Sequence, residues 1–255
     1  MRFNRIFLLL FLTLALALGG CEDNTKVDAP QQLPTANEYD GAQDAPSAPI
    51  KVENNSEFLS SVVFVGDSTT AHMASRAAIA PTQVWATKSR FLNLSPRVTD
   101  ERIILPETGA ELTIAEAAAA VKPPILVVTL GVDYGVYYYR DAPDKFAFYY
   151  EKLLDAITAA SPDTTLVLQS IFPVGRESKV ITNDMVDAAN RVVAQIAATR
   201  GLTYLDANTL LKDEGGYLKA AFCSSADGIH LTAAAYEVIL SNLACHEAEI
   251  KGQTA

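Results

Sequence analysis

Three side chains, one near the start of the domain and two near its end, have the types that nucleophilic acyl chemistry needs. Ser68 directly follows Gly66 and Asp67 at the end of a short apolar run, and Asp227 precedes His230 by three residues near the other end of the chain. A serine attacks a carbonyl only when an imidazole takes its proton, and that imidazole needs an acid that orients it. A turn of this length can bring the Asp227 carboxylate beside the His230 ring.

Apolar runs and amphipathic stretches alternate between these residues and predict how they are positioned. Continuous apolar runs predict strands at 62–65, 125–130, 164–171 and 202–205, with shorter strands at 84–86 and 102–105. Helical spacing predicts helices at 69–78, 112–121, 144–160, 184–200 and 231–247. Because strands and helices alternate with short connections, we expect an α/β domain with three layers (α/β/α) around a central, mainly parallel sheet.

Polar residues follow the carboxyl ends of the predicted strands. They are found at 66–68, 131–133 and 169–170, and the turn 227–230 comes just before the last helix. Ligands of such sheets bind beyond the carboxyl ends of the strands. We therefore expect the serine and the Asp-His turn to lie together at the carboxyl ends of the strands.

The chain resembles the SGNH/GDSL hydrolases in two segments, VGDS at 65–68 and DGIHL at 227–231. The resemblance spans nearly the whole folded part of the chain. It implies a flavodoxin-like fold and an enzyme that hydrolyses esters without a cofactor. It implies Ser68 as nucleophile and backbone oxyanion donor, His230 as general base and then acid, and Asp227 as the group that orients the ring. An α/β-hydrolase proper is disfavoured, because the serine segment lacks the last glycine of a G-x-S-x-G elbow.

Two other oxyanion donors of that family are changed in this chain. The family uses a glycine N–H and the asparagine of a Gly-x-Asn motif, but residues 86–91 hold no glycine, and Gly131 is followed by Val132 and Asp133. An ionised Asp133 only accepts hydrogen bonds and would repel an oxyanion. Two interpretations stay open: a buried, protonated Asp133 that donates to the oxyanion, or a structural carboxylate that bonds nearby backbone N–H groups.

Aromatic residues gather directly after Asp133. Tyr134 and the run 137–139 leave a central strand, so they either line a binding cleft, where they stack on a sugar or hold an acyl group, or pack locally. The next aromatic residues are expected on the core face of the following helix, at 146, 149 and 150. His72 lies four residues after Ser68 on the same helical face and is expected to be a packed or half-exposed helix residue.

The N-terminus predicts an address for the protein. Residues 1–20 combine two arginines, an apolar run too short to span a bilayer and a Gly-Gly exit, as secretory signal peptides do. Cys21 follows directly, so LGGC at 18–21 resembles the lipobox of bacterial lipoproteins, whose cysteine carries fatty acids such as palmitate. The alternative is an ordinary signal peptide with an unrelated cysteine.

The rest of the chain divides into three predicted parts. Residues 21–57 start with the lipidated cysteine and form a flexible acidic tether, residues 58–250 form the hydrolase-like domain, and residues 251–255 form a short tail. More than one acyl chain anchors a protein stably. We therefore expect a membrane-anchored, extracytoplasmic lipoprotein.

Composition excludes several other classes. The chain has 30 acidic and 20 basic side chains and a net charge of −10, which argues against nucleic-acid partners and against electrostatic docking on anionic lipid. Three cysteines and three histidines without HExxH or CxxC argue against a metal-centred mechanism. If Cys21 is lipidated, Cys223 and Cys245 remain as one pair that could form a disulfide outside the cytoplasm.

These patterns together predict a serine ester hydrolase that acts on a small ester or an O-acylated glycan through an acyl-enzyme. Two alternatives stay open. Because Asp133 stands where the family has an oxyanion-binding asparagine, the chain could instead be a catalytically weak or inactive module that has the same fold and binds glycan. An O-acyltransferase would use the same three catalytic side chains.

Overall fold

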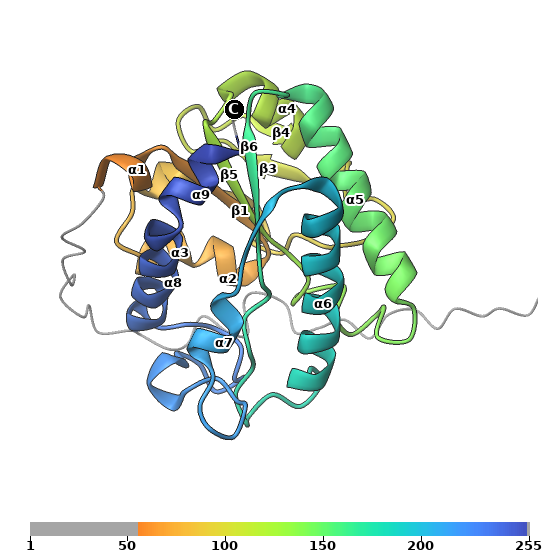
Figure 1. Cartoon of the computed structure of the whole chain (residues 1–255), viewed down its shortest axis with the longest axis vertical. Coiled ribbons are helices and arrows are strands. Elements are labelled where there is room, and N and C mark those ends of the chain that lie inside the picture. The colour runs from red at the N-terminus through yellow and green to blue at the C-terminus, as the bar shows by residue number, and fades with distance from the viewer. Residues whose placement is uncertain (1–55, 254–255) are drawn as a thin grey trace, which may run out of the picture. The chain divides into compact units, whose positions relative to one another are not determined.

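The central sheet has seven strands within residues 56–253, the part of the chain that the computed structural model describes (Figure 1). Its strands are β1 (Val62–Gly66), β2 (Val84–Thr87), β3 (Arg102–Ile104), β4 (Glu111–Thr113), β5 (Ile125–Thr129), β6 (Thr165–Gln169) and β7 (Thr203–Leu205). Their spatial order is β4-β3-β2-β1-β5-β6-β7. The strands β2, β1, β5, β6 and β7 run parallel, whereas β3 pairs antiparallel with β2 and β4. The predicted mainly parallel sheet is confirmed.

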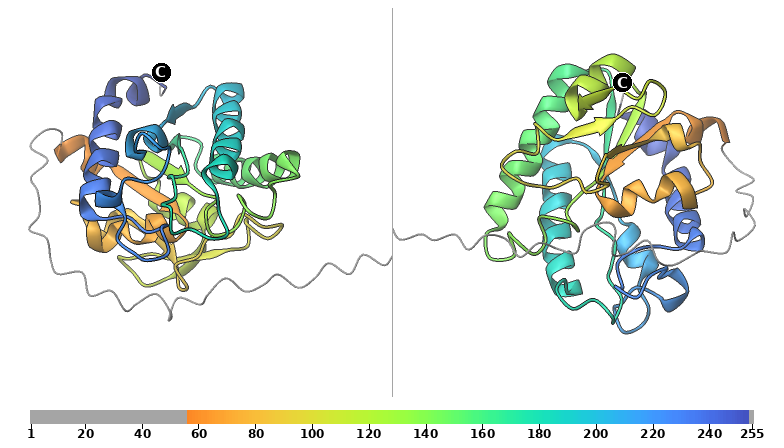
Figure 2. Two further views of the ribbon diagram at one scale, coloured as in Figure 1. Left: turned by 90° about the horizontal axis from the view of Figure 1, so that it is seen from below. Right: turned by 180° about the vertical axis from the view of Figure 1, so that it is seen from behind.

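Helices cover both faces of this sheet (Figures 1 and 2). One face packs against α4 (Ile114–Val121), α5 (Pro143–Ala160) and α6 (Asn183–Arg200). The other packs against α1 (Ser56–Ser60), α3 (Met73–Arg76), α7 (Ala207–Leu211), α8 (Ala233–Cys245) and α9 (Glu247–Gly252). The three-layer α/β/α prediction is therefore confirmed.

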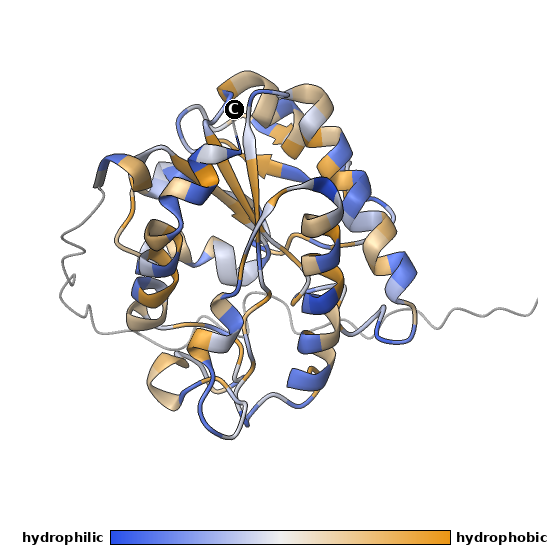
Figure 3. Cartoon of the chain, viewed as in Figure 1, coloured by the Kyte–Doolittle hydropathy of each residue, from blue (hydrophilic) through white to orange (hydrophobic). Residues whose placement is uncertain are grey.

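Strand β5 illustrates how one apolar run stabilises both layers. Its residues are all buried; Leu126 and Val128 belong to the core beneath α4–α6, and Ile125 and Val127 belong to the core beneath α1 and α8. Successive side chains of a strand point to opposite faces. Figure 3 shows the result, with hydrophobic strands in the middle and hydrophilic residues along α5 and α6.

Several helix boundaries differ from the sequence prediction. The helix expected at 69–78 is split into α2 (Ser68–Ala71) and α3, and His72 lies between them. At the break, the Thr69 carbonyl accepts a hydrogen bond from the Tyr236 hydroxyl of α8 at 2.5 Å, so a tertiary contact interrupts the local pattern. The helix expected at 231–247 becomes α8 and α9, and β4, α1 and α7 were not predicted.

The predicted ends of the domain also change slightly. The tether was expected to reach residue 57, but α1 begins at Ser56, and the tail was expected from residue 251, but α9 extends to Gly252. The signal peptide and Cys21 lie outside the described residues. Within 56–253, no helix is both long and apolar enough to cross a bilayer.

Candidate active site

Ser68 is the first residue of α2, where the chain turns sharply after β1. The carboxylate of Asp67 caps this short helix by accepting hydrogen bonds from the Thr69 N–H at 3.2 Å and the Thr69 hydroxyl at 2.7 Å. A methyl group on Gly66 would lie 2.0 Å from the Thr129 carbonyl oxygen of β5. The Gly-Asp-Ser segment therefore combines close strand packing, a helix cap and the serine in three consecutive residues.

Asp67 also connects this turn to the loop that follows β5. Its second carboxylate oxygen accepts hydrogen bonds from the N–H groups of Gly131 at 3.0 Å and Val132 at 2.9 Å. The side chain is almost completely buried, and Gly131 adopts a φ of 144° that favours glycine. This role of Asp67 was not predicted from the sequence, although a carboxylate beside the nucleophile in a buried turn was the available signal.

The loop fixed by Asp67 brings Asp133 onto Ser68. One Asp133 carboxylate oxygen accepts from the Ser68 backbone N–H at 2.7 Å, and the other accepts from the Ser68 hydroxyl at 2.6 Å. Asp133 therefore bonds a backbone N–H, as the structural interpretation expected, but the group it bonds is the expected oxyanion donor. Gly131 contributes to this arrangement through its N–H bond to Asp67.

Burial makes the charges of these two carboxyl groups costly. The pKa of Asp133 is raised well above its ordinary range by burial and then by the negative charge of Asp67, while the two bonds from Ser68 only partly oppose this. Burial also raises the pKa of Asp67, although the bonds from Thr69, Val132 and Gly131 oppose it. Two neighbouring carboxyl groups, of which Asp67 is almost completely buried and Asp133 is partly buried, favour a state in which one of them carries a proton.

Asp227 and His230 form a hydrogen-bonded pair on the loop before α8. The His230 Nδ1 atom lies 2.8 Å from one Asp227 carboxylate oxygen, and the other oxygen accepts from the Ile229 N–H at 2.7 Å and from the Ser225 hydroxyl. Burial alone would raise the pKa of Asp227, but these bonds hold it well below the ordinary value. The ionised carboxylate only accepts, so Nδ1 carries the proton and Nε2 is the basic nitrogen.

His72 packs against this pair from the break between α2 and α3. The His72 and His230 ring centroids are 4.5 Å apart with an interplanar angle of 36°. Arg76 donates from Nη1 to His72 Nδ1 at 3.3 Å, to the Ser224 hydroxyl at 2.7 Å and to the Leu231 carbonyl at 3.1 Å. Burial, followed by the charges of His230 and Arg76, lowers the pKa of His72 to about 3. His72 is half-buried, as expected, but it contacts the proposed base.

The tyrosines that follow Asp133 form one aromatic cluster. Tyr134 stacks on Tyr138 with ring centroids 4.0 Å apart and an angle of 16°, and Tyr137 meets the edge of Tyr138 at 5.5 Å. These rings are partly exposed, so the cluster is open to solvent beside Asp133. On α5, Phe146 and Tyr150 are buried and Tyr149 is partly buried against the core, as the helical pattern predicted.

The other candidate residues do not join this site. Cys223 and Cys245 are both free thiols, so the hypothesised disulfide is not formed; the Cys223 Sγ instead contacts the Ser225 carbonyl at 3.2 Å. Cys21 lies outside the described residues. Among residues 56–253, no group of three metal-ligating side chains is close enough to hold an ion.

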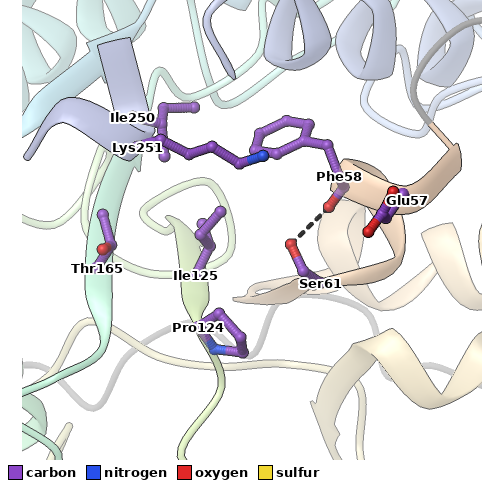
Figure 4. Close-up of a pocket in the computed structure, with 8 residues that line it drawn as sticks. All are labelled: Glu57, Phe58, Ser61, Pro124, Ile125, Thr165, Ile250 and Lys251. Carbon is purple, nitrogen blue, oxygen red and sulfur yellow. Dashed lines mark hydrogen bonds between the residues drawn. The ribbon is translucent and has the colours of Figure 1, made fainter. Parts of the chain in front are cut away.

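A cavity of about 320 Å³ lies at the amino ends of the strands, at the opposite end of the sheet from Ser68 (Figure 4). Pro124 and Ile125 line it at the start of β5, Thr165 lines it at the start of β6, and the Phe58 carbonyl accepts from the Ser61 hydroxyl at 2.7 Å beside it. These are the amino ends of the strands. Because Ser68 follows the carboxyl end of β1, this cavity is separate from the candidate active site.

The family model of GDSL-like lipases and acylhydrolases matches residues 64–238, which include Ser68, Asp227 and His230. This chain belongs to the GDSL-like lipase/acylhydrolase family. It is therefore an ester-bond hydrolase, as the sequence resemblance implied.

The comparison with solved structures finds matches to a lipase, a lipase/acylhydrolase and an esterase. A GDSL-like lipase from Bacteroides thetaiotaomicron is 13% identical, with a TM-score of 0.49 and coverage of 74% of this chain and 87% of that one. A lipase/acylhydrolase from Enterococcus faecalis is 16% identical, with a TM-score of 0.47 and coverage of 75% and 96%. A catalytic mutant of the acetylxylan esterase Axe2 from Geobacillus stearothermophilus is 18% identical, with a TM-score of 0.43 and coverage of 73% and 93%. The comparison with curated proteins gives no match.

Proposed function

We propose that this hydrolase is an extracytoplasmic lipoprotein that cleaves acyl esters with Ser68 as nucleophile, His230 as base and Asp227 as the orienting acid. One observation carries the assignment of these three residues. His72 lies one helical turn beyond Ser68 and packs 4.5 Å from the His230 ring, which Asp227 in turn holds by Nδ1. The nucleophile and the base therefore belong to elements that are packed against each other.

The reaction proceeds in two halves that share the same proton carrier. Ser68 Oγ bonds to the acyl carbon while its proton moves to His230 Nε2, and the carbonyl electron pair moves onto the carbonyl oxygen. The ester C–O bond then breaks, and the leaving oxygen takes the proton from His230. Water attacks the acyl-enzyme in the same way and releases the carboxylic acid, while Asp227 stays ionised and stabilises the imidazolium.

The aromatic cluster supports an O-acylated glycan as the substrate. Tyr134 directly follows Asp133 and stacks on Tyr138, and Arg140 lies over the Tyr137 ring at 4.5 Å. Aromatic faces supply a large apolar contact area, and tyrosine hydroxyls add polar contacts. A sugar that carries an acyl group could use both kinds of contact. The LGGC segment at 18–21 supports a location at the membrane outside the cytoplasm.

The proposal is tested with the lipid-free chain from residue 22 onward and its Ser68→Ala variant. p-Nitrophenyl acetate and acetylated xylo-oligosaccharides serve as substrates, and intact-protein mass spectrometry follows the acyl-enzyme. We expect turnover and an acetyl adduct on Ser68 in the wild type and neither in Ser68→Ala. Retained turnover in Ser68→Ala would refute the mechanism. Radiolabelled palmitate that is incorporated in cells by the wild type but not by Cys21→Ala tests the lipid anchor.

A glycan-binding module without turnover is the second candidate, and one contact favours it. The Asp133 carboxylate occupies the Ser68 N–H that an oxyanion needs. A binder would retain glycan affinity in Ser68→Ala, with no turnover in either protein. An acyltransferase would instead transfer the acetyl group to an added sugar acceptor, which product analysis detects.

A further inference from the structure

Asp133 is hydrogen-bonded to both groups of Ser68 that the proposed reaction uses, the backbone N–H and the hydroxyl. Its carboxylate oxygens lie 2.7 Å from the Ser68 N and 2.6 Å from the Ser68 Oγ. During acyl transfer the N–H must face the carbonyl oxygen as that oxygen becomes negative, and the hydroxyl must release its proton to the base. A carboxylate at this position therefore competes with the substrate for the same donors.

The two neighbouring carboxyl groups differ in how many donors stabilise their charge. Asp67 accepts four hydrogen bonds, from the N–H and hydroxyl of Thr69 and the N–H groups of Gly131 and Val132. Among residues 56–253, Asp133 accepts two hydrogen bonds, which both come from Ser68, at its N–H and its hydroxyl. Hydrogen bonds to the charged form of a carboxyl group favour that form. Of the two groups, Asp133 is therefore the one that takes a proton.

The charges that act on Asp133 from neighbouring elements add to this effect. Asp67, on the turn after β1, and Asp227, on the loop before α8, are both acidic and both raise the pKa of Asp133. The hydrogen bonds that lower the pKa of Asp227 keep that residue negative. The negative Asp227 carboxylate is also hydrogen-bonded to His230 Nδ1.

We propose that Asp133 is a proton-dependent oxyanion residue, which blocks Ser68 as a carboxylate and donates to the oxyanion as a neutral carboxylic acid. The inference rests on the proposed function. In the neutral form, Asp133 gives up the charge-assisted bond to the Ser68 N–H, and its own O–H supplies the donor that the family takes from asparagine. The Asp133 proton stays on Asp133, because the Ser68 proton goes to His230.

The direction of the pH effect follows from this assignment. The active form carries the proton on Asp133, so kcat/KM falls as the pH rises through the pKa of Asp133. Asparagine keeps a donor and cannot ionise. We expect Asp133→Asn to lose this alkaline fall and to exceed the wild type at least about tenfold at pH values above that fall, since one oxyanion donor is typically worth about 10² to 10³ in turnover.

The test measures kcat/KM for p-nitrophenyl acetate from pH 4 to 9 in the lipid-free chain. The variants are Asp133→Asn, Asp133→Ala and, as a matched control, Asp163→Asn on the exposed turn between α5 and β6. Asp133→Ala removes both the block and the donor. It should also lose the alkaline fall, but its rate should lie about 10² below that of Asp133→Asn. The control should follow the wild-type profile.

A stability measurement gives a readout that does not depend on turnover. The folded-state pKa of Asp133 is above its unfolded value, so its stabilising contribution is complete below the unfolded pKa and is lost as the pH rises through the folded pKa. Asp133→Asn lacks this loss. The melting temperature of the variant should therefore rise relative to the wild type as the pH increases, while that of Asp163→Asn should not.

Each outcome supports or overturns the inference. An alkaline fall that persists in Asp133→Asn, a lower rate of this variant than the wild type at pH values above the wild-type fall, or parallel melting profiles would each overturn it while Ser68-dependent turnover remains. If the wild type and all variants lack Ser68-dependent turnover at every pH, the proposed function itself fails, and the inference fails with it.

Discussion

The buried carboxylate of Asp67 should contribute more to stability than an ordinary helix cap. Replacing it by alanine removes the cap of α2, worth about 1 kcal/mol, and leaves the buried N–H groups of Gly131 and Val132 without their acceptor, at about 1 to 3 kcal/mol each. Removal of a buried charge beside Asp133 offsets part of this loss. We therefore expect Asp67→Ala to lower the free energy of unfolding by about 3 kcal/mol, which is near the low end of the combined loss of the cap and the two N–H acceptors.

Asp206 provides a matched control for the cap alone. It caps α7 and accepts from the Thr209 N–H at 3.0 Å and the Thr209 hydroxyl at 2.6 Å, nearly the same contacts that Asp67 makes with Thr69, but it is exposed. Asp206→Ala should cost about 1 kcal/mol. Urea unfolding followed by the fluorescence of Trp85, the single and buried tryptophan, measures both variants. If Asp67→Ala loses no more stability than Asp206→Ala, the bonds between the two loops do not stabilise the fold as argued.

Substitutions at three further positions test individual contacts. His72→Ala should lower kcat at least about tenfold with little change in KM, because the ring that packs 4.5 Å from His230 is lost. His72→Phe keeps a ring at this position and should keep most of the rate. Equal losses in the two variants would mean that ring packing is not the cause. Gly66→Ala should greatly reduce the soluble yield and the melting temperature, because the new methyl group would lie 2.0 Å from the Thr129 carbonyl oxygen; a wild-type melting curve would contradict this. Tyr138→Ala should raise KM for acetylated xylo-oligosaccharide but not for p-nitrophenyl acetate, and an equal change for both substrates would argue against a sugar platform.

Much of the fold was predictable because its signals are local. The apolar runs that became β1, β5 and β6 are each buried on both faces, and such runs are the pattern of a parallel sheet covered by helices. The break at His72 was not predictable, because it coincides with a hydrogen bond from Tyr236, which lies 167 residues from Thr69 in the sequence. The start of α4 was also missed, because Thr113 ends β4 and caps the helix at the same position.

The sequence by itself determined the residue types of the candidate site and the edge at which they gather. Ser68 follows a strand, and Asp227 precedes His230 at a spacing that permits their hydrogen bond, so both features depend on short stretches of chain. Only the tertiary structure decided what Asp133 contacts. Its bonds to Ser68 span 65 residues and depend on Asp67, which holds the loop after β5 by two backbone N–H groups. The protonation of Asp133 likewise depends on burial and neighbouring charge, which arise only when distant segments pack together.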